Sequence, residues 1–351
     1  MKVLHVLSDN IFSGAQNVVC QIIALFREKD PGTEMVFVCP EGPVREALEA
    51  REIRYVPLPA LKAGALRQIL RREMPDLVHA HDVRASVLCA LACGRTPMIS
   101  HIHNNHVDAR RISLRSLSYL PAARKAAHIF WVSSSALEEY RFSRAVRNKS
   151  SVLFNVIDMA AVEEKAARDP EAPARDLVFA GRLTYQKHPQ RLLSVAELLL
   201  ARRPGLTMSI LGDGELYEEM CRLAGSKGLA DHVLLPGFAS NPYGTIQKAG
   251  ALLLTSRWEG TPMVALEAMS LGTPVVSTPT DGMKDLVRQG ENGFLGETDE
   301  ELAAAAAAIL EDPALRRRMS EACRETARRI NDTDSYYARI RNVYETALHI
   351  Q

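Results

Sequence analysis

The amino-acid sequence predicts an α/β protein made of two Rossmann-like domains that face each other across a cleft. Short apolar runs alternate with longer amphipathic stretches, which is the pattern of βα units around a parallel sheet. The alternation stops at a polar, proline-bearing stretch over residues 169–173 and then starts again. The chain of 351 residues is also long for a single hydrophobic core and suits two domains.

Both predicted domains follow the same rhythm of strands and helices. Strands of the first domain, residues 1–168, are expected at 3–7, 35–38, 77–79, 98–102 and 129–132, with helices at 15–27, 61–72 and 83–93. Strands of the second domain, residues 174–330, are expected at 176–180, 207–211, 232–235, 251–254 and 274–276. Apolar side chains at helical spacing predict a helix at 335–350, within a terminal segment 331–351. This helix either caps its own domain or packs back on the first one.

The composition is that of an ordinary soluble protein. A net charge of +1 argues against a dedicated nucleic-acid binder. No apolar run approaches the roughly 20 residues of a membrane span, and the first residues turn polar too early for a signal peptide, so we expect the protein in the cytoplasm. Six scattered cysteines without CxxC spacing predict buried reduced thiols rather than disulfides or a metal site.

Basic residues are concentrated in one part of the first domain. Residues 109–149 contain nine Lys or Arg side chains and only two acidic ones, Glu138 and Glu139. Between Arg110 and Leu120 the cations lie beside an aliphatic stripe, as in helices that bind membrane surfaces. This pattern predicts peripheral contact with anionic lipid at the inner face of the cell membrane. A solvated basic face on a helix packed against its own domain is the alternative.

Two glutamates, Glu259 and Glu267, flank a predicted helix start. Thr261 is the expected N-cap, Pro262 the first helical residue and Gly272 the stop. Unpaired amides at a helix start attract phosphate, whereas carboxylates prefer hydroxyls or a positively charged sugar carbon. A rise of roughly 1.5 Å per residue separates the two glutamate backbones by about 12 Å, too far for one glycosidic bond. We therefore expect them to bind different ends of one nucleotide sugar.

The segment from Glu259 to Glu267 resembles the motif of the retaining glycosyltransferases of family 4, a Glu, seven residues and then Glu-Ala-Met, here Glu267-Ala268-Met269. The resemblance implies the GT-B fold and a hexosyltransferase that moves a sugar, with retention, from a nucleoside diphosphate sugar to an acceptor hydroxyl. UDP is the expected nucleotide. The membrane contact predicted for the basic segment would give access to a polyprenyl-linked saccharide as the acceptor, in cell-surface polysaccharide or glycolipid synthesis. The terminal helix would cross back to the first domain.

The resemblance also assigns roles to residues of the predicted donor site. Arg182 and Lys187 would grip the diphosphate, although His188 stands where the family usually has Gly. Glu267 would hold the ribose and Glu259 would lie near the transferred sugar, and Glu259, Arg182 and Lys187 are expected to be catalytic. Further donor contacts are expected at Gly14, Ala239, Gly260, Thr261, Pro262 and Met263.

The first domain contributes one more candidate by the same resemblance. His101 and His103 end a predicted strand, and strand alternation places both side chains on one face. No carboxylate or Cys accompanies them at ligand spacing, so we expect no metal there. His103 would be catalytic and reach the transferred sugar. Gly14 lies in Ser13-Gly14-Ala15-Gln16, where the family usually shows Gly-Gly-Ala-Glu, so the glycine is kept and its neighbours differ.

No cofactor is expected. The string Asp332-Thr333-Asp334 precedes the terminal helix, where Asp is a favoured N-cap, so we expect metal-independent activity. Gly212-Asp213-Gly214 lacks the third glycine of the dinucleotide fingerprint, which argues against NAD. Two other function classes stay open, a nucleotide-sugar 2-epimerase with the GT-B fold and a non-catalytic GT-B binding subunit.

Overall fold

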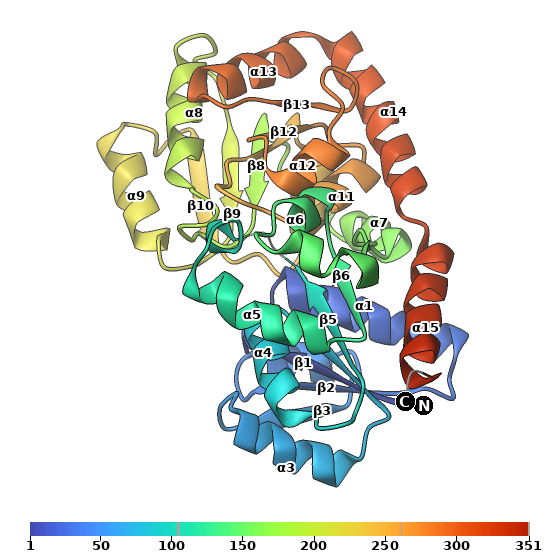
Figure 1. The fold of residues 1–351 in the computed structure, drawn as a ribbon. Helices are drawn as coiled ribbons and strands as arrows, with labels where there is room; N and C mark the ends of the chain where they lie inside the picture. Colours follow the sequence, from blue (N-terminus) through green and yellow to red (C-terminus); the bar gives the residue numbers. More distant parts are fainter. Residues whose placement is uncertain (104–105, 261, 350–351) are drawn as a thin grey trace. The chain divides into compact units, whose positions relative to one another are not determined.

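The computed structural model describes residues 1–103, 106–260 and 262–349 (Figure 1). The chain divides into two compact units, one made of Met1–Val156 with Asp332–Gln351 and the other of Ile157–Asn331. Each unit contains one all-parallel sheet with helices on its faces. The prediction of two Rossmann-like α/β units is therefore confirmed.

The first unit has a seven-stranded sheet in the order β3-β2-β1-β4-β5-β6-β7. Its strands are β1 (Lys2–Leu7), β2 (Glu34–Pro40), β3 (Tyr55–Leu58), β4 (Leu77–His81), β5 (Met98–Ile102), β6 (His128–Trp131) and β7 (Ser150–Val152). Its helices are α1 (Gly14–Lys29), α2 (Val44–Glu49), α3 (Ala63–Glu73), α4 (Val83–Ala92), α5 (Leu114–Lys125), α6 (Ser134–Glu138) and α15 (Thr333–His349), with short 3-10 turns η1 (Val107–Ala109), η2 (Ser143–Ala145) and η3 (Arg147–Lys149).

Side-chain alternation gives this sheet two different faces. Leu4, Val6 and Val78 belong to the apolar core beneath α3, α4 and α5. The opposite face is covered by α1 and by the terminal helix α15, which contact each other and which Figure 1 shows side by side. Tyr344 of α15 is fully buried there. The helix therefore packs back on the first unit, as the resemblance implied.

The second unit has a six-stranded sheet in the order β10-β9-β8-β11-β12-β13. Its strands are β8 (Leu177–Ala180), β9 (Met208–Leu211), β10 (Val233–Gly237), β11 (Ala251–Leu254), β12 (Val275–Ser277) and β13 (Gly293–Leu295). Its helices are α7 (Met159–Ala167), α8 (Gln190–Leu200), α9 (Tyr217–Ser226), α10 (Tyr243–Lys248), α11 (Met263–Ser270), α12 (Asp281–Leu286), α13 (Asp299–Glu311) and α14 (Pro313–Ile330). α13 packs on α8, whereas α11 packs on α14 and α7.

Two further sequence expectations concern the thiols and the membrane. All six cysteines are free and all except the half-buried Cys221 are buried, in line with the prediction of reduced, packed thiols. Among the helices in the described ranges, none is both long enough and apolar enough to cross a bilayer.

Candidate functional site

The strongest candidate site lies where the second sheet reverses its strand order. From β8 the chain adds β9 and β10 on one side, and then returns to add β11 on the other side. β8 and β11 are therefore parallel neighbours whose carboxyl ends lie together. Open α/β sheets bind ligands at such a switch point. The loop after β8 carries Arg182 and Lys187, and the loop after β11 carries Glu259.

These two loops are joined by a buried ion pair. Lys187 Nζ donates to Glu259 Oε1, and the two side chains are only 17% and 7% exposed. Ser256 donates its hydroxyl to the same carboxylate oxygen at 2.6 Å. Two hydrogen bonds hold the loops together, one between backbone atoms from Arg257 N to Gln186 O at 2.8 Å, and one from the Gln186 side chain, Nε2 to Trp258 O at 3.0 Å. Two residues predicted from distant motifs are thus brought into direct contact.

The residue after Lys187 has an unusual backbone conformation. His188 has φ of +49°, the left-handed region that favours glycine. Its carbonyl accepts a hydrogen bond from Thr255 Oγ1 at 3.0 Å, which ties the turn to the end of β11. The turn therefore keeps the conformation for which glycine is best suited, although this chain carries histidine.

Gly212 and Gly214 pack closely against the backbone of the loop after β8. A Cβ on Gly212 would lie 1.8 Å from the carbonyl oxygen of Gly181, and one on Gly214 would lie 2.5 Å from the carbonyl oxygen of Leu183. Leu183 also donates its amide to Asp213 O at 2.8 Å. The Gly-Asp-Gly string therefore allows close backbone packing against the loop of Arg182 and Lys187.

The helix after Glu259 starts later than the sequence suggested. α11 begins at Met263 with Pro262 as its N-cap residue, so the prediction of Pro262 as the first helical residue is wrong by one position. The N-cap predicted at Thr261 lies outside the described residues. Proline offers no side-chain cap, and its ψ of 116° is extended rather than helical. Gly272 follows the helix end with φ of +81°, as expected for a helix stop.

Glu267 lies on α11 in a very different setting from Glu259. Its side chain is almost completely buried and Oε1 accepts a hydrogen bond from the Tyr243 hydroxyl at 3.2 Å. Burial raises the pKa of Glu267 to about 7, against smaller opposing effects of the Tyr243 hydrogen bond and the charge of Lys165. The carboxyl group therefore holds a proton more tightly than an exposed glutamate does.

The remaining predicted donor residues lie on strand ends or helix starts of their own units. Arg182 is exposed just after β8, and Ala239 follows β10 beside the highly exposed Phe238. Gly260 is buried after β11. In the first unit, Gly14 is the first residue of α1 and His103 directly follows β5.

The turn before Gly14 is ordered by the residue that replaces the usual glutamate. Gln16 is buried, its Oε1 accepts a hydrogen bond from Ser13 Oγ at 2.5 Å, and its Nε2 donates to Asp9 O at 3.2 Å. Ser13 itself provides no side-chain cap for α1. Gln16 thus stabilises the loop between β1 and the helix start.

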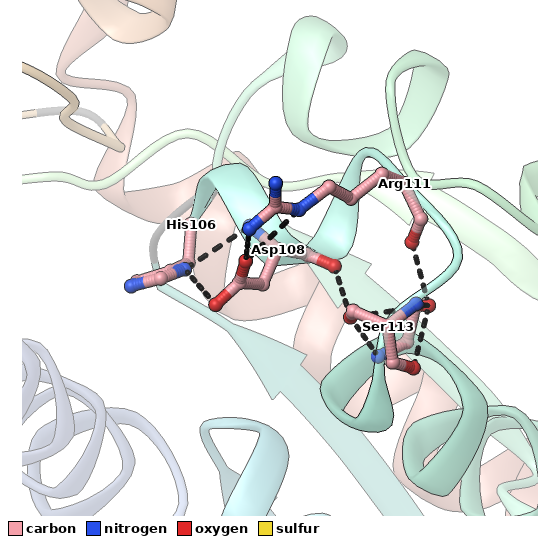
Figure 2. Close-up of polar contacts among 5 residues, drawn as sticks. His106, Asp108, Arg111 and Ser113 are labelled. Atoms are coloured by element: carbon pink, nitrogen blue, oxygen red, sulfur yellow. Dashed lines mark hydrogen bonds and ion pairs between the residues drawn. The ribbon is translucent and has the colours of Figure 1, made fainter.

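Residues 106–113, which precede α5, are held by polar contacts around Asp108 (Figure 2). Arg111 pairs with the Asp108 carboxylate at 2.5 Å, and His106 Nδ1 accepts from the Asp108 amide at 3.2 Å. Ser113 Oγ donates to Asp108 O at 2.5 Å, and Ser113 forms a capping box with Ser116 at the start of α5. These contacts fix residues 106–113 against the start of α5.

Two polar residues of the second unit had no sequence-based role although they contact the predicted glutamates. Ser256 lies three residues before Glu259, so its position at the strand end was the available signal. Tyr243 comes from α10 and reaches Glu267 across 24 positions of sequence, a distance that no local pattern reveals.

Both halves of the chain are similar to known glycosyltransferases. Residues 12–161 match the model of Glycosyltransferase Family 4, and residues 163–326 match that of Glycosyl transferases group 1. The chain is 27% identical over 232 residues to an uncharacterized glycosyltransferase of Methanocaldococcus jannaschii, covering 60% of this chain and 57% of that protein. It is 28% identical over 305 residues to the lipopolysaccharide 1,6-galactosyltransferase of Salmonella typhimurium, covering 81% and 82% of the two chains.

A solved structure supports the fold. The crystal structure of Anabaena Alr3699/HepE in complex with UDP-glucose matches with a TM-score of 0.86 and 20% identity, over 99% of this chain and 100% of that one. This likeness shows that the fold is of the GT-B type, as the sequence motif implied.

Proposed function

Because both halves of the chain match glycosyltransferase family models, we propose that this protein transfers a hexose from a nucleoside diphosphate sugar to an acceptor hydroxyl with retention. The observation that carries the proposal is the buried Lys187–Glu259 pair at the switch point of the second sheet. The UDP-glucose complex of the Anabaena protein supports UDP as the nucleotide. We place the reaction in the synthesis of cell-surface polysaccharide or glycolipid.

In this mechanism the ion pair changes partners when the donor binds. The diphosphate competes with Glu259 for Lys187, and Arg182, exposed on the same loop, adds a second cation. Both cations stabilise the charge that develops as the diphosphate leaves. Glu259, released from Lys187, faces the sugar and stabilises an oxocarbenium-like state on the front face instead of forming a covalent intermediate.

The other donor contacts follow from the same placement. The segment Gly260, Pro262 and Met263 at the start of α11 binds the phosphates, and Glu267 accepts hydrogen bonds from the ribose hydroxyls. The backbone at Ala239 contacts the base. Gly14 contacts the donor from the first unit, and His103 contacts the transferred sugar. Thr261, predicted with this group, lies outside the described residues.

Product analysis with a panel of nucleotide sugars, with and without acceptor extracts, tests the proposal. We expect transfer that depends on acceptor, proceeds with retention and persists in excess EDTA, since the mechanism assigns no metal. Glu259→Gln should lower kcat by about a hundredfold or more because the charge that faces the sugar is lost. The variant keeps an amide oxygen for Ser256, so its unfolding midpoint provides a control for folding. An unchanged kcat, or activity abolished by EDTA and restored by Mn²⁺, would contradict this mechanism.

The same assay separates the alternatives. A 2-epimerase would interconvert nucleotide sugars without an acceptor, and a binding subunit would bind donor without turnover. The relatives reported above do not favour either, because their names describe transferases.

We further propose that the first unit contacts an anionic membrane that holds a polyprenyl-linked acceptor. Four apolar residues around the start of α5 are exposed, namely Val107 (46%), Ile112 (64%), Leu114 (86%) and Leu117 (49%). Arg111 and Arg124 are exposed in the same basic segment. Apolar side chains flanked by cations suit the interface of an anionic bilayer. Two other cations of the basic segment serve the fold, since Lys125 donates to Ala90 O and Lys149 to Ala126 O.

Liposome flotation tests the membrane proposal. The protein should float with vesicles that contain anionic lipid and be released by salt, and Leu114→Ser with Leu117→Ser should abolish flotation because the insertion surface is lost. Leu234→Ser removes an equally exposed leucine, 48%, from the second unit and should leave flotation unchanged. Equal flotation with neutral vesicles, or none with anionic ones, would refute the proposed surface.

A further inference from the structure

A row of histidines lines one face of the first sheet. Three adjacent strands contribute them: β1 carries His5, β4 carries His79 and His81, and β5 carries His101. His103 directly follows β5. Strand register pairs His5 with His79 and His81 with His101, which places all five on the face opposite the α3–α5 core. All are completely buried except His103, which is partly exposed at the strand end. Among these five, the sequence pattern pointed only to His101 and His103.

Three of these imidazoles form a continuous hydrogen-bonded chain. His5 Nδ1 lies 3.0 Å from His81 Nε2, and His81 Nδ1 lies 2.9 Å from His103 Nε2. Both ring nitrogens of His81 are thus engaged. His79 does not belong to the chain, because its Nδ1 bonds the Tyr344 hydroxyl at 2.7 Å.

The distances favour shared protons over a shared metal ion. Two imidazoles on a tetrahedral zinc, with Zn–N of about 2.0–2.1 Å, would hold their nitrogens roughly 3.3 Å apart. The nitrogen pairs here are closer and match hydrogen bonds. No carboxylate among the described residues joins either three-histidine group, so a dication would be buried without a neutralising charge.

The chain permits only two arrangements of protons. Burial lowers the pKa of His5 and of His103 to about 3, so both rings are neutral, and each neutral ring has one donor and one acceptor nitrogen. If His5 donates to His81, then His81 donates to His103 and the proton of His103 is on Nδ1. If the direction is reversed, His103 carries its proton on Nε2 and His5 on its own Nε2.

The two ends of the chain differ in exposure. His5 Nε2 and His103 Nδ1 are both buried nitrogens without a hydrogen-bond partner among the described residues, so each arrangement leaves one N–H without a protein acceptor. His5 is completely buried on the sheet face, whereas His103 is partly exposed at the strand end, where a bound ligand can accept its N–H. The arrangement that puts the proton of His103 on Nδ1 is therefore favoured.

We propose that His81, supported by His5, is a positioning residue that fixes the tautomer of His103 with its proton on Nδ1. His103 is then a hydrogen-bond donor at the end of β5. This step deepens the proposed function, in which His103 contacts an oxygen of the transferred sugar.

Nitrogen-15 NMR of histidine-labelled full-length protein tests the proposal without donor or acceptor. In the wild type, His103 should show a protonated Nδ1 and an unprotonated Nε2, and His81 should show the same. In His81→Phe, which keeps a ring but removes both nitrogens, His103 should lose this fixed pattern. The matched control is His79→Phe, because His79 stacks on His81 at 4.2 Å but lies outside the chain. It should leave the His103 signals unchanged.

Several outcomes would overturn the inference. They are a wild-type His103 protonated on Nε2, a His103 pattern that persists in His81→Phe, and stoichiometric metal in protein purified without added metal. The wild-type spectrum needs no substitution, so a variant that fails to fold leaves the test intact. In the transfer assay, His81→Phe should lower kcat by about tenfold or more without changing the Kd for UDP. Failure of transfer in the wild type would contradict the proposed function while the tautomer result stands.

Discussion

The two motif glutamates are both buried but have different partners. Glu259 is paired with Lys187 and Ser256, whereas Glu267 has only the Tyr243 hydroxyl as a hydrogen-bond donor among the described residues and a pKa raised to about 7. The sequence motif identified both residues but could not tell them apart in this respect. Their partners come from α10 and from the loop after β8, which only the tertiary fold brings near.

The raised pKa of Glu267 makes stability depend on pH. Between the ordinary value of 4.5 and about 7, the folded protein holds a proton that the unfolded chain has lost. The free energy of unfolding should therefore fall as pH rises through this window, by up to roughly 3 kcal/mol. Denaturant unfolding of wild type and Glu267→Gln at several pH values measures this, since Gln cannot titrate. Parallel curves for the two proteins would show that Glu267 is not the cause.

His188 shows the limit of motif comparison at a single position. Glycine is usual there in the family that the motif resembles, whereas this chain has histidine. The structure keeps φ of +49° with histidine in place, so the backbone of the loop is retained at some local strain. Residue identity alone does not reveal a backbone dihedral angle.

At the scale of elements, the sequence predicted the central strands and the edge strand β10, and missed the other three edge strands. Strands at 98–102 and 251–254 were predicted with their observed bounds. The missed strands, β3, β7 and β13, are all edges of their sheets. Edge strands are short and less apolar, and β3 even contains Pro57, which is tolerated only where a ladder hydrogen bond is not needed. Periodicity cannot identify three or four residues of this kind.

The contact between the strand ends of β8 and β9 carries a second prediction. Gly212→Ala places a methyl group on the Gly181 carbonyl, so the loop with Arg182 and Lys187 must shift. We expect a loss of about 1–3 kcal/mol in the free energy of unfolding and an increase of about tenfold in the Kd for UDP. Chemical unfolding and calorimetric titration measure the two effects.

Gly225→Ala is the matched control for this substitution. Gly225 lies in α9 with nothing within 4 Å of an added Cβ, so alanine should stabilise the helix by up to about 1 kcal/mol. Its affinity for UDP should stay that of the wild type. If Gly212→Ala behaves like Gly225→Ala, the glycines of this string are not needed for the loop.

At the scale of the whole molecule, the C-terminal segment, with helix α15, belongs to the first unit together with the N-terminal half of the chain. The apolar stripe predicted from spacing, including Tyr336, Ile340, Tyr344 and Ala347, is the buried face of α15. Asp332 Oδ1 accepts a hydrogen bond from Ser335 N at 2.8 Å, so this aspartate caps the helix as expected. Asp334 pairs with Lys29 of α1. The pattern predicted the buried face, and the fold shows that it lies against α1 and β4.

Because α15 packs on the first unit, a substitution in its buried face should destabilise that unit. Tyr344→Ala removes a fully buried ring and its hydrogen bond to His79, and should cost about 3–5 kcal/mol. Hydrogen exchange followed by mass spectrometry should show faster exchange in peptides of β1, β4 and α1, with residues 157–331 unchanged. Thr346→Ala, at an exposed position of the same helix, should match the wild type within about 0.5 kcal/mol. Faster exchange confined to residues 157–331 would mean that α15 stabilises the second unit instead.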